Sequence, residues 1–268
     1  MSVVQQDFTI VGRHGPIDGR AYGASAVAPR TGLVWFHGGG FLGGDLDMPA
    51  ADWVARSIAT EGFTVVSGDY SKCVGGVHYP VPNHDVLDLW SWVGEHASDL
   101  GIDSAAIHLG GASVGAALAA SVAKRLRDGA GESPRSLILV YPVLHYELPE
   151  ADEELRAVLS EYSDSVLTPD LVRSISENYA GAAELANDIY AFAANGDLAG
   201  LPPTLILNSE IDSLRASGEA FGTGLERAGV DVVVEYEPHA AHGHLNEPFQ
   251  EAASRSVTRI VEWLRRHH

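Results

Sequence analysis

Short apolar runs rich in β-branched residues alternate with longer segments of helical periodicity along most of this chain. Continuous apolar runs indicate strands that are covered on both faces, because half-exposed strands alternate apolar and polar residues. The runs occupy residues 33–36, 63–66, 107–109, 137–141, 204–207 and 232–236. Helical spacing lies between them, for example in residues 86–93, 116–126 and 257–264. This alternation predicts an α/β fold with a mostly parallel sheet and helices on both faces.

Two segments depart from the alternation. Residues 8–21 indicate an antiparallel pair that turns at Gly15-Pro16 or at Asp18-Gly19. Residues 145–190 carry two or three helical patterns with no strand between them, and we interpret them as a helical cap inserted into a single domain of residues 1–268. An ordinary pair of surface helices would give the same periodicity. The apolar residues that could pack over the sheet edge are Leu155, Val158, Leu159, Leu167, Leu171, Val172 and Ile175.

The charge and cysteine content exclude several classes of protein. With 17 basic and 36 acidic residues the formal charge is −19, which repels nucleic acids and anionic membrane surfaces. The single cysteine, Cys73, excludes an intrachain disulfide and a metal site built on paired thiols. The first seven residues lack the pattern of a signal peptide, and no apolar run is long enough to span a membrane. We therefore expect a soluble, cytoplasmic protein, and the sequence leaves open whether it is a monomer or a homodimer.

A G-x-S-x-G motif, Gly111 to Gly115, stands between the apolar run 107–109 and the helix-forming run 116–120. A nucleophile on a sharp strand-to-helix turn has a strained backbone and tight neighbours, so the positions two residues away must be nearly free of side chain. The helix that begins at the serine also directs its first amides toward a developing oxyanion. The motif predicts that Ser113 is a catalytic nucleophile.

A glycine-rich loop, residues 37–41 with the sequence His-Gly-Gly-Gly-Phe, follows the first apolar run. Consecutive glycines let main-chain N–H groups approach a substrate oxygen closely, as an oxyanion hole requires. We expect His37 to organise this backbone by hydrogen bonding rather than to act as a base, because a later histidine fits the chain order of such sites.

A serine nucleophile needs a base and an acid that orients the base, and in this fold the chain order is serine, acid, histidine. The run 204–207 is followed by two carboxylates and the run 232–236 by three imidazoles. These candidates are Glu210, Asp212, His239, His242 and His244. Both loops leave the carboxyl ends of late strands, where ligands bind in α/β proteins. Asp212 is favoured because it follows its strand by a turn, and His242 because Gly243 permits a tight turn behind it.

At these motifs the chain resembles the hormone-sensitive-lipase-like family of α/β-hydrolase carboxylesterases. The resemblance extends from residue 32 to the C-terminus and rests on the His-Gly-Gly-Gly loop, the serine elbow, residues 198–204 leading into Asp212-Ser213-Leu214-Arg215, and His242-Gly243. It implies the α/β-hydrolase fold. It also implies a triad and an oxyanion hole made by three amides, with these members: Ser113, Asp212 and His242 for the triad, and Gly39, Gly40 and Val114 for the amides.

The chain departs from the family pattern at three positions that bear on substrate choice. Val114 stands in the elbow where the family commonly has alanine, the loop at residues 71–80 lacks the usual Arg-Leu-Ala-Pro-Glu pattern, and His244 replaces a phenylalanine. We expect a serine hydrolase that cleaves a small ester, prefers acyl chains of about two to six carbons and needs no metal or organic cofactor. An amidase, formamidase or lactone hydrolase would use the same triad, and a non-catalytic ligand-binding protein could use the same scaffold.

Overall fold

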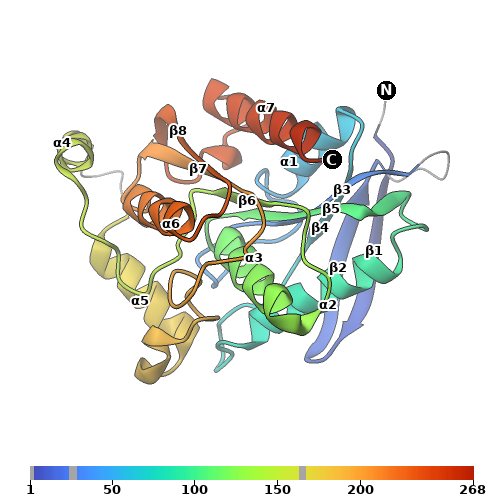
Figure 1. Ribbon diagram of the computed structural model, residues 1–268, viewed down its shortest axis with the longest axis horizontal. Helices are drawn as coiled ribbons and strands as arrows, with labels where there is room; N and C mark the ends of the chain where they lie inside the picture. Colours follow the sequence, from blue (N-terminus) through green and yellow to red (C-terminus); the bar gives the residue numbers. More distant parts are fainter. Residues whose placement is uncertain (1–2, 24–28, 163–166) are drawn as a thin grey trace.

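The computed structural model describes residues 3–23, 29–162 and 167–268, whose strands form one sheet in the order β1-β2-β4-β3-β5-β6-β7-β8 (Figure 1). Strands β3 to β8 are parallel to one another, and β1 and β2 join them as an antiparallel hairpin. The strands are β1 (Gln5–Gly12), β2 (Gly15–Tyr22), β3 (Arg30–Phe36), β4 (Thr64–Gly68), β5 (Ile102–Ala112), β6 (Leu137–Val140), β7 (Thr204–Ile211) and β8 (Val232–Ala241). Each of the six predicted strands overlaps one of β3 to β8, which confirms the predicted sheet.

The N-terminal hairpin turns at a different place from either predicted turn. Gly12 of β1 pairs with Gly15 of β2, so Arg13 and His14 form the turn. The predicted turn residues instead lie within β2, where Pro16 pairs with Val11. A proline is tolerated close to the start of a strand, and Gly15, with φ 134°, supplies the backbone freedom that the turn needs.

Helices cover both faces of the sheet and leave the carboxyl ends of the parallel strands free for loops. Helices α1 (Asp52–Thr60) and α7 (Glu251–Arg266) pack on one face, whereas α2 (Val81–Glu95), α3 (Val114–Arg125) and α6 (Arg215–Arg227) pack on the other (Figure 1). Successive strand residues point to opposite faces, so Trp35 of β3 joins the core under α1 and α7 while Val34 and Phe36 join the core under α3. No helix among the described residues is long and apolar enough to cross a membrane.

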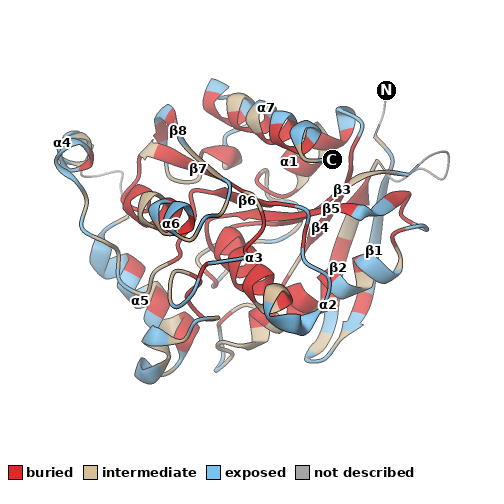
Figure 2. Cartoon of the chain, viewed as in Figure 1, coloured by how far each residue is buried: buried red, intermediate tan, exposed pale blue. Residues whose placement is uncertain are grey.

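The segment 145–190 contains helices α4 (Glu153–Glu161) and α5 (Pro169–Ala180) and a short 3-10 helix (Ala183–Asn187), with no strand among its described residues. Figure 2 shows α4 and α5 largely exposed, in contrast to α3, which is buried along most of its length. Leu155 and Val172 are buried, as expected, but Leu171 is 47% exposed. Neighbouring residues on a helix point about 100° apart, so Leu171 and Val172 cannot both face the sheet.

Candidate active site

Ser113 occupies the sharp turn between β5 and α3, in the centre of the sheet. Its backbone has φ 55° and ψ −119°, a conformation that non-glycine residues rarely adopt. A Cβ atom on Gly111 would lie 2.7 Å from the Phe36 carbonyl oxygen, and one on Gly115 would lie 2.3 Å from the same atom. The two glycines of the motif are therefore required by close packing of β3 against the elbow, as the sequence predicted.

Asp212 and His242 reach Ser113 from the ends of β7 and β8. Asp212 follows β7 directly, is wholly buried, and accepts a hydrogen bond at Oδ1 from the Leu214 amide at 3.0 Å. His242 follows β8, with Nδ1 2.6 Å from Asp212 Oδ2 and Nε2 3.2 Å from Ser113 Oγ. The structure therefore brings together the three residues that the sequence selected, in one hydrogen-bonded chain.

The rival candidates lie elsewhere. The His239 side chain is 89% exposed, and its backbone amide donates to Glu210 Oε2 at 2.5 Å, so Glu210 supports the strand end rather than the base. His244 is buried between two hydroxyl groups, with Nδ1 3.0 Å from Ser209 Oγ and Nε2 2.7 Å from Ser256 Oγ. Burial lowers the pKa of His244 to about 4. Among the candidate bases, His244 is thus a core residue whose ring two serines satisfy.

Tyr141 is a member of the site that the sequence reasoning missed. It follows β6 with φ 37°, is 1% exposed, and its ring meets the His242 ring edge-on at a centroid distance of 5.0 Å. The same ring meets His244 at 5.1 Å. Tyr141 therefore packs edge-on against both imidazoles. No period or motif marks such a residue, although its position at the end of the predicted strand 137–141 was a signal.

The glycine-rich loop after β3 lies beside Ser113. Gly39 and Gly40 have φ of 133° and 64°, and a Cβ atom on Gly39 would lie 2.1 Å from the Gly43 carbonyl oxygen. Among the described residues, we find no main-chain acceptor for the amides of Gly39, Gly40 or Val114. Amides left free beside a nucleophile can receive a substrate oxyanion.

His37 begins this loop and is buried against the loop after β4. Its Nε2 lies 3.0 Å from Asp69 Oδ1, which also accepts a hydrogen bond from Lys72, and its ring stacks on Tyr70. Burial alone would raise the pKa of Asp69, but the hydrogen bonds from His37 and Lys72 bring it down to about 2. The two ring nitrogens of His37 are taken up by the Gly38 carbonyl and by Asp69, so His37 organises the backbone of the glycine loop.

A cavity of about 260 Å³ opens beside Ser113 and His242. Its walls come from the glycine loop, from the segment before α1, from α5 and from the loops that carry the acid and the base. The lining residues are Gly38, Gly39, Gly40, Met48, Ser113, Val114, Tyr141, Val143, Leu167, Val172, Ile175, Leu214, His242, Gly243 and Asn246. No acidic residue, lysine or arginine is among these described lining residues, so the cavity suits an uncharged, mostly apolar group.

The chain is similar to known esterases. Residues 33–246 match the family of the α/β-hydrolase fold. The chain is 31% identical to the esterase LipI of Mycobacterium tuberculosis, over 89% of this chain and 74% of LipI. It is 29% identical to an ethyl acetate hydrolase of Pseudomonas putida, over 88% of this chain and 73% of that protein. The solved structure of a Pyrobaculum calidifontis esterase has a TM-score of 0.87 and 31% identity, over 97% of this chain and 85% of that one.

The fold and the relatives together define a carboxylic ester hydrolase built on a central β-sheet with helices on both faces. The chain belongs to the α/β-hydrolase family, among the hormone-sensitive-lipase-like esterases. The predicted family, fold and enzyme class are thereby confirmed.

Proposed function

We propose that the protein hydrolyses small, uncharged carboxylic esters through an acyl-enzyme formed on Ser113. His242 is the general base and acid, Asp212 orients it, and the amides of Gly39, Gly40 and Val114 hold the oxyanion. The observation that carries the proposal is the continuous chain from Ser113 Oγ through His242 to Asp212, with separations of 3.2 and 2.6 Å. Nucleophile, base and orienting acid in hydrogen-bond reach are the geometry that acyl transfer needs.

The reaction proceeds in two matched halves. Ser113 Oγ attacks the ester carbonyl carbon while His242 Nε2 takes the serine proton, and Asp212 stabilises the resulting imidazolium. The carbonyl oxygen becomes an oxyanion that the three amides bind. Collapse of the intermediate expels the alcohol, which receives the proton from His242 and leaves an acyl group on Ser113. Water then attacks this acyl group by the same route and releases the carboxylic acid.

The segment 145–190 is, in this proposal, a cap that closes the site and limits substrate size. Val172 and Ile175 of α5 line the cavity, and Ile175 Cδ1 would lie 3.8 Å from a Cβ atom on Gly40. A cavity of about 260 Å³ is small for a ligand pocket, which commonly has about 300–1,000 Å³. Acyl chains of about two to six carbons are therefore preferred. The similarity to an ethyl acetate hydrolase supports short esters.

A panel of p-nitrophenyl esters from acetate to dodecanoate, assayed beside anilides and lactones, tests the proposal. We expect the highest kcat/KM at or below hexanoate, little turnover of anilides, and a loss of about 10⁶ in kcat for Ser113→Ala. A dodecanoate that is cleaved faster than a butyrate would contradict the size limit. Activity of Ser113→Ala within tenfold of wild type, in protein free of contaminating esterase, would remove Ser113 from the mechanism.

A further inference from the structure

Met48 stands in the wall of the catalytic cavity, on the segment between β3 and α1. A methionine side chain is unbranched and adaptable, so the shape it gives to a wall depends on how firmly its backbone is held. The Asp45 carboxylate accepts hydrogen bonds from the Asp47 amide at 3.0 Å and from the Met48 amide at 3.1 Å. The Met48 carbonyl accepts the amides of Ala51 and Asp52, each at 2.8 Å.

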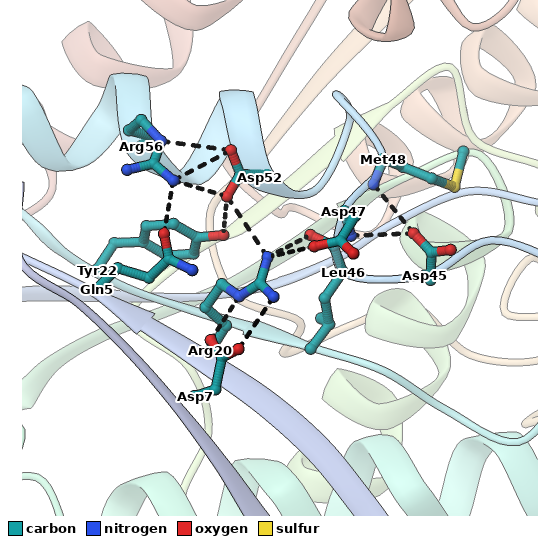
Figure 3. Close-up of polar contacts among 10 residues, drawn as sticks. All are labelled: Gln5, Asp7, Arg20, Tyr22, Asp45, Leu46, Asp47, Met48, Asp52 and Arg56. Atoms are coloured by element: carbon teal, nitrogen blue, oxygen red, sulfur yellow. Dashed lines mark hydrogen bonds and ion pairs between the residues drawn. The ribbon is translucent and has the colours of Figure 1, made fainter.

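Arg20 of β2 fixes the residues just before Met48. One nitrogen of its guanidinium, Nη1, donates to the Leu46 carbonyl at 3.2 Å and to Asp47 Oδ1 at 2.8 Å. The opposite edge of the guanidinium donates to Asp7 of β1 at 2.6 and 3.1 Å (Figure 3). The Arg20 side chain is only 12% exposed, and a planar guanidinium held on two edges leaves its acceptors little freedom.

The same strand holds the chain just after Met48. Tyr22 lies two residues beyond Arg20, on the same face of β2, and its hydroxyl donates to Asp52 Oδ1 at 2.7 Å (Figure 3). Between these two attachments, the Ala50 amide donates to Asn246 Oδ1 at 3.2 Å, and Asn246 also lines the cavity. The hairpin is thus connected through one short segment to a cavity wall and to the loop of His242.

We propose that Arg20 is a positioning residue for substrate selection: by holding Leu46 and Asp47 it keeps the Met48 wall in place and limits the size of the substrate group that fits there. This inference rests on the proposed ester-binding role of the cavity. Arg20 does not line the cavity itself, so its effect passes through the backbone of Met48. Releasing the wall should favour longer substrates over shorter ones.

The test uses two substrate ladders, p-nitrophenyl esters from acetate to octanoate and acetates of alcohols from ethanol to hexanol. The variants are Arg20→Gln, Met48→Ala, the double variant and Arg13→Gln. Arg13 is the matched control, because it joins the same hairpin to Asp88 of α2 at 2.5–3.2 Å, away from the cavity. Circular dichroism checks the folding of each variant. If Arg20→Gln does not fold, Asp47→Ala replaces it, because that change removes an exposed carboxylate that accepts from Arg20.

We expect Met48→Ala to raise the ratio of kcat/KM for long over short substrates by about fivefold or more in one ladder. Arg20→Gln should raise the same ratio in the same ladder, mainly through a change in KM. The double variant should exceed Met48→Ala by no more than about twofold, because both changes act on one wall. Arg13→Gln should leave both ladders unchanged. The inference would be overturned if Arg20→Gln shifted the ratio in neither ladder, or in a different ladder from Met48→Ala. It would also be overturned if Arg13→Gln gave a shift as large as that of Arg20→Gln. Ser113→Ala in the same assay tests the catalytic proposal separately.

Discussion

Replacing Asp212 with asparagine changes one atom of a buried side chain and should lower kcat/KM by about 10⁴. The Asp212 carboxylate accepts at both oxygens, from the Leu214 amide at 3.0 Å and from His242 Nδ1 at 2.6 Å. Asparagine has one acceptor oxygen and one donating NH₂. Because the Leu214 amide is a fixed donor, the asparagine oxygen should turn toward it and present the NH₂ group to His242.

That arrangement holds His242 in the wrong tautomer. With Nδ1 accepting from the asparagine, the ring proton sits on Nε2, 3.2 Å from Ser113 Oγ, and the ring can no longer take the serine proton. A loss of about 10⁴ corresponds to about 5 kcal/mol in activation free energy. The assay is kcat/KM for p-nitrophenyl butyrate with folding confirmed by circular dichroism. The control is Glu210→Gln, at the same strand end, which should stay within about fivefold of wild type. Activity of Asp212→Asn within tenfold of wild type, or a larger loss in Glu210→Gln, would refute the reasoning.

Two further predictions concern stability. Gly115→Ala should lower the free energy of unfolding by about 1–3 kcal/mol, because the new Cβ would lie 2.3 and 2.4 Å from the carbonyl oxygens of Phe36 and His37. The measurement is a urea titration, and the control is Gly94→Ala on α2, where an added Cβ would meet nothing outside its own helix and should not be destabilising. Equal losses in both variants would contradict this packing argument. Burial lowers the pKa of His244 to about 4 from 6.5, so the neutral ring stabilises the fold fully above pH 6.5 and this contribution is lost as the pH falls toward 4. His244→Gln should therefore flatten the fall in stability over that range by about 3 kcal/mol, and an unchanged slope would show that His244 does not titrate as proposed.

Much of the fold and of the serine elbow follows from local sequence. The strand runs, the glycines around Ser113 and the glycine loop after β3 each carry a steric requirement that a sequence displays directly. The acid and the base were harder, because Glu210 competed with Asp212 and two other histidines with His242. The register of β7 against β8 shifts at this point, because Ser209 pairs with Glu237 but Ile211 pairs with Ala241. This shift distinguishes Asp212 and His242 from the other candidates.

The remaining parts of the site arise from contacts between segments that are distant in sequence. Met48, Tyr141 and Asn246 enter the cavity wall from three separate segments, and no motif in their own neighbourhoods marks them. The sequence prediction missed the hairpin turn at Arg13 and His14, because Pro16 and Gly19, which favour turns, are accommodated inside β2. Tertiary pairing determined these positions, and a local pattern does not contain that information.

Direct capture of the acyl-enzyme tests the central claim. Mixing the protein rapidly with p-nitrophenyl butyrate should give a burst that approaches one p-nitrophenolate per active site if deacylation is the slower step. Acid quenching followed by peptide mass spectrometry should then find the butyryl group on the peptide that carries Ser113, and Ser113→Ala should show neither burst nor adduct. An adduct on another residue, or an undiminished burst in Ser113→Ala, would contradict the account.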